Sequence, residues 1–204
     1  MIYNVLNVIF PFLTGIYVAR VLLPDSIGQV ETARNLAQYF VILAFLGIPT
    51  YGLREIANAR NDKDALSKVY SELIVLNGIS TAIFSALYFS LVIFIPYYRE
   101  NLVLYLVAGI SIVLNFLNNS WFYEGLEEFK FISLRNLFFK IVTFALLIIL
   151  VRDQDDYIWY ALLTVIGTAG NYIFNVLKAH KFVHFSFKEL ELKRRTGQLY
   201  SATM

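Results

Sequence analysis

The sequence contains no cysteine, and charged side chains make up only 16% of its 204 residues. The absence of cysteine excludes disulfide bonds and thiolate chemistry. The scarcity of charge excludes an ordinary soluble domain, in which about 25% of residues are charged because the surface must be solvated. Since 58% of the residues are hydrophobic and the mean hydropathy is +0.62, most of this chain needs lipid as its solvent.

The signatures of several function classes are also missing. No basic run is interleaved with aromatic residues, so we expect no nucleic-acid partner. No glycine-rich loop precedes a lysine as ATP binding requires, and His180 and His184 have no further metal ligand near them in the sequence. Asp153, Asp155 and Asp156 are best read as a solvated turn. The sequence therefore predicts neither an enzyme nor a bound metal or cofactor.

Six stretches are long and apolar enough to cross the membrane, which takes roughly 20 residues for about 30 Å of hydrocarbon. They are residues 2–22, 30–50, 71–95, 102–122, 132–151 and 157–178. The fifth carries Arg135 and Lys140, which we expect to snorkel toward the nearer interface. The segment that starts at Tyr51 predicts a short amphipathic interfacial helix. The predicted fold class is thus all-α integral membrane, with six transmembrane helices.

The lysine and arginine residues of the connecting segments predict the orientation. With a cytoplasmic N-terminus, thirteen of them lie on the cytoplasmic side and three on the other side. The three are Arg20, Arg99 and Arg152. Because cytoplasmic loops carry an excess of positive charge, we expect both termini to be cytoplasmic.

Polar residues inside four of the predicted spans fall on one face of each helix. These stripes are Asn4, Asn7, Pro11 and Thr14; Glu31, Arg34, Asn35 and Gln38; Ser111, Asn115, Asn118 and Asn119; and Thr164, Thr168, Asn171, Asn175 and Lys178. Single amides can be explained as interhelical hydrogen bonds, worth about 0.6 kcal/mol each, but four stripes indicate a wet cavity, as in transporters. The fifth span is expected to face lipid. Arg34 either forms a structural pair with Glu31 or faces a substrate.

Three segments together resemble the polysaccharide-export flippases (Wzx-type) of the multidrug/oligosaccharidyl-lipid/polysaccharide exporter superfamily. They are residues 17–22 (YVARVL), followed by Pro24 and Gly28; residues 51–57 (YGLREIA); and residues 121–130 (WFYEGLEEFK), followed by Arg135 and Asn136. Their order and their positions relative to the predicted spans make the combination specific. We expect the third segment to be structural, with Trp121 anchored at the membrane interface.

The resemblance implies a substrate, a location and a cycle. Such flippases move undecaprenyl-pyrophosphate-linked oligosaccharides across the bacterial plasma membrane for O-antigen, capsule or exopolysaccharide synthesis, alongside the polysaccharide polymerase machinery. Two helical lobes enclose a cavity that opens alternately to either side. The candidates for attracting the pyrophosphate are Arg20, Arg34 and Arg54. The candidates for binding sugar hydroxyls are Asn35, Gln38, Asn115, Asn118 and Asn171.

The sequence departs from the family pattern in length. Residues 1–193 correspond to an N-terminal six-helix lobe, and residues 194–204 form an atypical tail, which suggests a truncated frame. A lone lobe would need a second copy or a second lobe to close its cavity. The alternatives are a cation-coupled small-molecule exporter of the same superfamily, a non-transporting membrane subunit, and a small membrane enzyme that acts on polyprenyl lipids.

Overall fold

The computed structural model describes the backbone of residues 2–184 and the side chains of residues 9–184, and within that range every regular element is a helix. The elements are α1 (Ile2–Val21), α2 (Pro24–Phe45), α3 (Ile48–Ala59), α4 (Lys63–Phe94), α5 (Pro96–Arg99), α6 (Leu102–Leu114), the 3-10 turn η1 (Asn115–Leu117), α7 (Ser120–Gly125), α8 (Phe129–Leu150) and α9 (Tyr157–Ala179). The predicted all-α class is therefore confirmed. The predicted tail, residues 194–204, lies outside the described residues.

Four segments of the described chain are long and apolar enough to cross a membrane. They are Lys63–Phe94, Leu102–Gly125, Phe129–Leu150 and Tyr157–Ala179. A fifth is obtained if α2 and α3, which meet at 43°, count as one broken span, and α1 contributes a shorter apolar stretch, Ile9–Val21. The protein is thus a multi-pass membrane protein, while the number of six spans stays a prediction.

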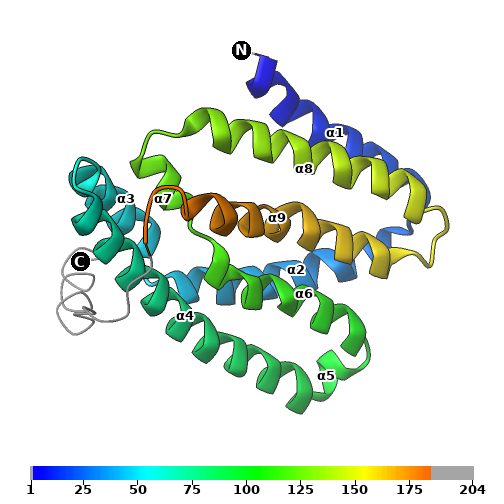
Figure 1. Ribbon diagram of the computed structural model, residues 1–204. Coiled ribbons are helices and arrows are strands. Elements are labelled where there is room, and N and C mark those ends of the chain that lie inside the picture. Colours follow the sequence, from blue (N-terminus) through cyan, green and yellow to red (C-terminus); the bar gives the residue numbers. More distant parts are fainter. Residues whose placement is uncertain (1, 185–204) are drawn as a thin grey trace.

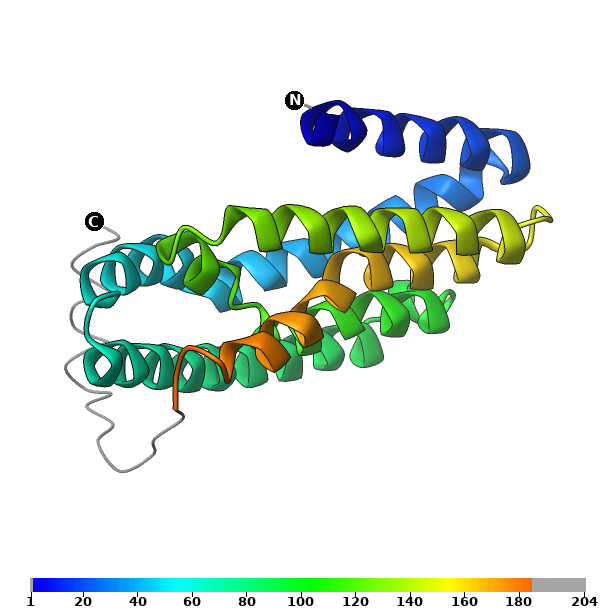
Figure 2. The same ribbon diagram turned by 45° about the horizontal axis from the view of Figure 1, so that its top comes forward.

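The long helices form one elongated bundle with α9 in its middle (Figure 1). Helix α9 packs against α8, α6 and α2, and α4 packs against α2 and α6 on the far side. Helix α1 lies along α8 and meets α2 near their shared turn, as the rotated view shows (Figure 2). Helices α3 and α7 lie at one end of the bundle, and α5 lies at the other end (Figure 1).

Two predicted spans differ from the structure for local reasons. Helix α4 begins at Lys63 and not near residue 71, because the Asp62 carboxylate caps it by accepting hydrogen bonds from the N–H groups of Asp64 (3.0 Å) and Ala65 (3.1 Å). The predicted continuous helix over residues 102–122 is wrong after Leu114. There the chain tightens into η1, leaves helical geometry at Asn118 and resumes as α7.

The α3/α7 end of the bundle has its own core, which we call the end cluster. It consists of Ile48, Tyr51, Ile56, Leu66, Val69, Tyr70, Leu73, Trp121, Phe122, Tyr123, Ala179 and Val183. The Trp121 side chain is only 2% exposed, so its expected role as an interfacial anchor is wrong. A Cβ atom added to Gly52 would lie 2.7 Å from the Trp121 ring, which shows how closely α3 approaches α7. The family-like segments around Gly52 and Trp121 thus build a packed core.

Candidate functional site

A cavity of about 270 Å³ lies between α2, α6 and α9, and we call it the central cavity. Its polar lining residues are Arg34, Asn35, Gln38, Ser111, Thr164 and Thr168. Its apolar lining includes Ala108 and Ala161, whose short side chains occupy little of the space. Three of the four predicted stripes therefore contribute polar groups, and the structure brings together the candidates Arg34, Asn35 and Gln38.

The stripe on α2 reaches this cavity because of helical periodicity. Arg34 and Gln38 lie one turn apart, so both side chains project from the same face. Ala33, Ala37 and Val41 lie on another face of α2 and are buried in the bundle. One face of α2 therefore packs against other helices, and a neighbouring face keeps its polar groups accessible.

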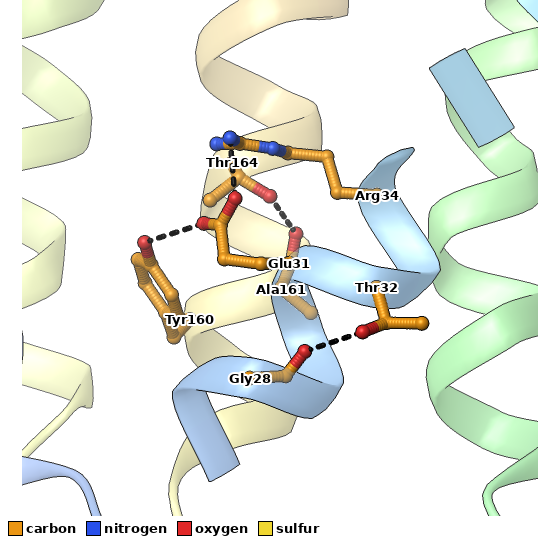
Figure 3. A network of polar contacts seen from close by, with 7 residues as sticks. All are labelled: Gly28, Glu31, Thr32, Arg34, Tyr160, Ala161 and Thr164. Atoms are coloured by element: carbon orange, nitrogen blue, oxygen red, sulfur yellow. Dashed lines mark hydrogen bonds and ion pairs between the residues drawn. The ribbon is translucent and has the colours of Figure 1, made fainter. Parts of the chain in front are cut away.

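Arg34 is both paired and accessible. Its guanidinium forms an ion pair with the Glu31 carboxylate, one turn earlier on α2, and its side chain is still 51% exposed. The Tyr160 hydroxyl of α9 donates a longer hydrogen bond, 3.5 Å, to the other oxygen of Glu31. Figure 3 shows Glu31 and Arg34 pointing from α2 toward Tyr160 and Thr164 on α9. The two predicted roles of Arg34, structural pair and substrate contact, are thus compatible in one geometry.

A second cavity, of about 330 Å³, lies between α1, α8 and α9, and we call it the lateral cavity. Its polar or charged lining residues are Thr14, Arg34, Lys140, Thr143, Tyr160, Thr164 and Thr168. Phe10, Phe144, Leu147 and Leu163 supply apolar walls. Because Arg34, Thr164 and Thr168 line both cavities, the two spaces meet at a wall that these three side chains share.

Helix α8, the span that we expect to face lipid, is the least buried of the four candidate spans, with 11% of its apolar window buried, and it has two different faces. Phe138 and Ile141 are exposed apolar side chains on its outer face, as lipid contact requires. Lys140 and Thr143 line the lateral cavity. Arg135 does not snorkel as expected, because it is 7% exposed and lies over the Phe131 ring, 5.6 Å from the ring centroid.

The remaining cationic candidates lie apart from Arg34. Arg20 is in the last turn of α1. Arg54 is on α3, where it is 64% exposed and lies 4.0 Å from the Glu55 carboxylate. Neither residue lines the central or the lateral cavity. The structure therefore distributes the three predicted arginines along the bundle and brings only Arg34 to the two cavities.

The amide candidates Asn115, Asn118 and Asn171 do not line the central cavity either. Asn115 and Asn171 are buried, and Asn118 is half-buried at the break between α6 and α7. The Asn77 amide of α4 donates to the Asn115 carbonyl (3.1 Å) and less closely to the Phe116 carbonyl (3.4 Å). The Asn115 carbonyl also accepts from the Asn118 N–H (2.9 Å) within η1, so Asn77 adds a side-chain donor to two backbone carbonyls at the helix break.

Sequence reasoning missed the polar face of α4. Asn77, Ser80, Thr81 and Ser85 are all buried. Their spacing of three to four residues was a readable signal of one helix face. Tyr160 was also missed, because a tyrosine among apolar neighbours does not reveal a carboxylate partner from another helix.

The chemistry of the two cavities follows from their donors. A guanidinium presents N–H groups in a fork that matches phosphate oxygens, and amides and hydroxyls match sugar hydroxyls.

Among the described residues, no group of three or more histidine, aspartate or glutamate side chains is placed to hold a metal ion. The loop carboxylate of Asp156 instead accepts hydrogen bonds from the N–H groups of Arg152 (2.8 Å) and Asp153 (2.9 Å), which lower its pKa.

Comparison with known proteins agrees with these features. The family described as "Polysaccharide biosynthesis protein" matches residues 1–204. Two relatives are named "Putative O-antigen transporter". The one from Escherichia coli (strain K12) is 21% identical, and the match covers 87% of this chain and 42% of the relative. The one from Shigella dysenteriae is 24% identical, and the match covers 74% of this chain and 37% of the relative. The chain thus spans less than half the length of these relatives. No solved structure matches it. Since the family match extends over all 204 residues, the chain belongs to the polysaccharide biosynthesis protein family.

Proposed function

We propose that this chain forms part of a flippase that carries undecaprenyl-pyrophosphate-linked oligosaccharides across the bacterial plasma membrane. The observation that carries the proposal is the half-exposed Arg34 guanidinium where the central and lateral cavities meet. The names of the two relatives support the same substrate class. The oligosaccharide feeds O-antigen or a related surface polysaccharide.

The need to move a charged pyrophosphate through the membrane explains the polar residues of the central cavity. A pyrophosphate cannot cross hydrocarbon unshielded, because an ionised group near the bilayer centre costs about 2.5–3.5 kcal/mol on insertion scales. Arg34 offsets this cost by donating charge-assisted hydrogen bonds to phosphate oxygens. Glu31 holds the guanidinium in place when no substrate is bound. Asn35 and Gln38 then bind hydroxyl groups of the first sugars in the central cavity.

The orientation and the assembly are also proposals. The α3/α7 end carries Arg60, Lys63 and Lys130, and the opposite end carries Arg99 and Arg152. By the positive-inside rule, the α3/α7 end faces the cytoplasm, as do both termini. The described helices form one lobe, and a second lobe or a second copy faces the open side of the cavities. Arg20 and Arg54, toward opposite ends, guide the anion on either side.

Complementation tests the function. A bacterial strain without its own O-antigen flippase receives this chain alone, or this chain joined to the unmatched part of the E. coli relative, and surface polysaccharide is measured. The fusion is expected to restore polysaccharide, and Arg34→Gln is expected to lower it at least tenfold. Arg152→Gln, an exposed loop residue, is the matched control and should have no effect.

Each outcome has a defined meaning. If the chain alone restores polysaccharide, a second copy supplies the other half. If neither version does so despite membrane insertion, while the relative's full-length protein succeeds, the flippase proposal is contradicted. If Arg34→Gln and Arg152→Gln give equal amounts of surface polysaccharide, the proposed role of Arg34 in substrate binding is contradicted.

A further inference from the structure

The lateral cavity has a composition that the oligosaccharide does not explain. It places two cations, Arg34 and Lys140, beside apolar walls that include Phe10, Phe144 and Leu147. Lys140 is near the middle of α8. A lysine at that depth is costly unless it reaches a polar cavity or an anionic group. The combination of cations and hydrocarbon walls matches an amphiphile with an anionic head and an apolar tail.

The packing of α1 leaves this cavity accessible from the side. Helix α1 packs along α8 and makes far less contact with α9 (Figures 1 and 2), and the cavity occupies the space between α1 and α9. Gly15 lines it, and a Cβ atom added to Gly15 would meet no atom within 4 Å. The wall at Gly15 is therefore open and could accept a larger group.

We infer that the lateral cavity binds the polyprenyl-phosphate portion of the substrate, with Lys140 as a second cation for the phosphates and the first isoprenyl units in the space that α1, α8 and α9 enclose. This inference rests on the proposed function and deepens it. The central cavity, with its amides and hydroxyls, holds the sugars, and Arg34 lies at the junction. At about 330 Å³, the lateral cavity is too small for a whole polyprenyl chain, so the rest of the tail remains in the bilayer.

A binding experiment on the full chain in phosphatidylcholine nanodiscs tests the inference. The probes are undecaprenyl pyrophosphate, inorganic pyrophosphate, and nanodiscs that also contain phosphatidylglycerol. Gly15→Leu fills the cavity and is expected to weaken undecaprenyl pyrophosphate binding at least tenfold. Its control is Gly78→Leu, because an added Cβ at Gly78 also meets no atom within 4 Å and Gly78 lines neither cavity.

The charge is tested in the same assay. Lys140→Gln is expected to weaken undecaprenyl pyrophosphate and inorganic pyrophosphate binding several-fold, whereas Gly15→Leu affects only the probe with a tail. Lys130→Gln, exposed at the start of the same helix, is the control. A diazirine-bearing polyprenyl phosphate should crosslink to α1, α8 or α9, the helices that line the cavity, and mass spectrometry locates the site.

Three results would overturn the inference. The first is that Gly15→Leu and Lys140→Gln both bind undecaprenyl pyrophosphate with native affinity. If Arg34→Gln still lowers surface polysaccharide in the complementation assay, the proposed function remains intact and only this inference fails. The second is crosslinking outside α1, α8 and α9. The third is equal competition by phosphatidylglycerol, which would assign the cavity to ordinary anionic lipid. If the protein binds undecaprenyl pyrophosphate with native affinity but fails to restore surface polysaccharide, the result counts against the proposed transport function and not against the lateral cavity as a binding site.

Discussion

The end cluster and the two cavities differ in how closely their side chains fill the space between helices. In the end cluster, tyrosine and tryptophan side chains are buried against glycine, and the Cβ position of Gly125 lies 2.8 Å from Ile56. Around the cavities, alanine and threonine leave space, and Arg34 stays half-exposed. The segments that resemble the flippase family most visibly belong mainly to the packed region. A recognisable motif therefore marks the scaffold here, and the proposed binding residues lie elsewhere.

Removing the largest side chain of the end cluster should have the largest effect. Trp121→Ala is expected to lower the free energy of unfolding by about 3–5 kcal/mol, because it leaves a cavity in a buried core. The Trp121 indole N–H has no hydrogen-bond partner among the described residues, so the loss is one of packing. Thermal unfolding in detergent measures it. Trp159→Ala, 47% exposed, is the control, and an equal loss there would contradict the comparison.

Adding a single methyl group to the same region should have the next largest effect. Gly125→Ala is expected to cost about 1–3 kcal/mol of stability through overpacking, because the new Cβ would lie 2.8 Å from Ile56 and from the Leu53 carbonyl oxygen. Gly78→Ala meets no atom within 4 Å and should change the unfolding temperature little. If both variants unfold alike, α3 and α7 do not pack as closely as the structure shows.

The helix break between the two regions should be less sensitive. Asn77→Ala removes a donor from the Asn115 and Phe116 carbonyls, and interhelical hydrogen bonds in membranes average about 0.6 kcal/mol with a maximum near 1.7. We expect a loss in that range in the same unfolding assay. Asn58→Ala, exposed on α3, is the control. A loss as large as that of Trp121→Ala would show that polar contacts, and not packing, hold this part of the bundle.

The sequence predicted the all-α class and the one-sided stripe on α2, because hydropathy and helical periodicity are local properties. Arg34, Asn35 and Gln38 accordingly line one cavity. It did not predict the break after Leu114, because Asn115, Asn118 and Asn119 share one face of a continuous helix as well as they fit a break, and the compensating donor, Asn77, comes from a distant helix.

The position of Lys140 could not be predicted from its own helix. Its neighbours in the sequence are apolar, so snorkelling was the natural expectation, whereas the cavity that it lines is formed together with α1 and α9, which are distant in the sequence. Arg135 differs, because the Phe131 ring that it covers is one turn earlier on the same helix. That contact follows from helical periodicity, whereas tertiary arrangement decides the position of Lys140.

The smallest expected effect lies outside both regions, in the loop between α8 and α9. The N–H groups of Arg152 and Asp153 hold the pKa of Asp156 below its usual value. A carboxylate with a lowered pKa in the folded state stabilises the loop above its unfolded pKa, near 3.9, and loses that contribution as the pH falls through the folded value. We expect Asp156→Asn to reduce hydrogen-exchange protection of the Arg152 and Asp153 amides at pH 7. Asp155→Asn is the control at an exposed neighbouring position. If Asp156→Asn instead lowers the unfolding temperature as much as Gly125→Ala, the loop contributes to the global stability. The end cluster would then not be more sensitive to substitution than the rest of the bundle, which contradicts the comparison.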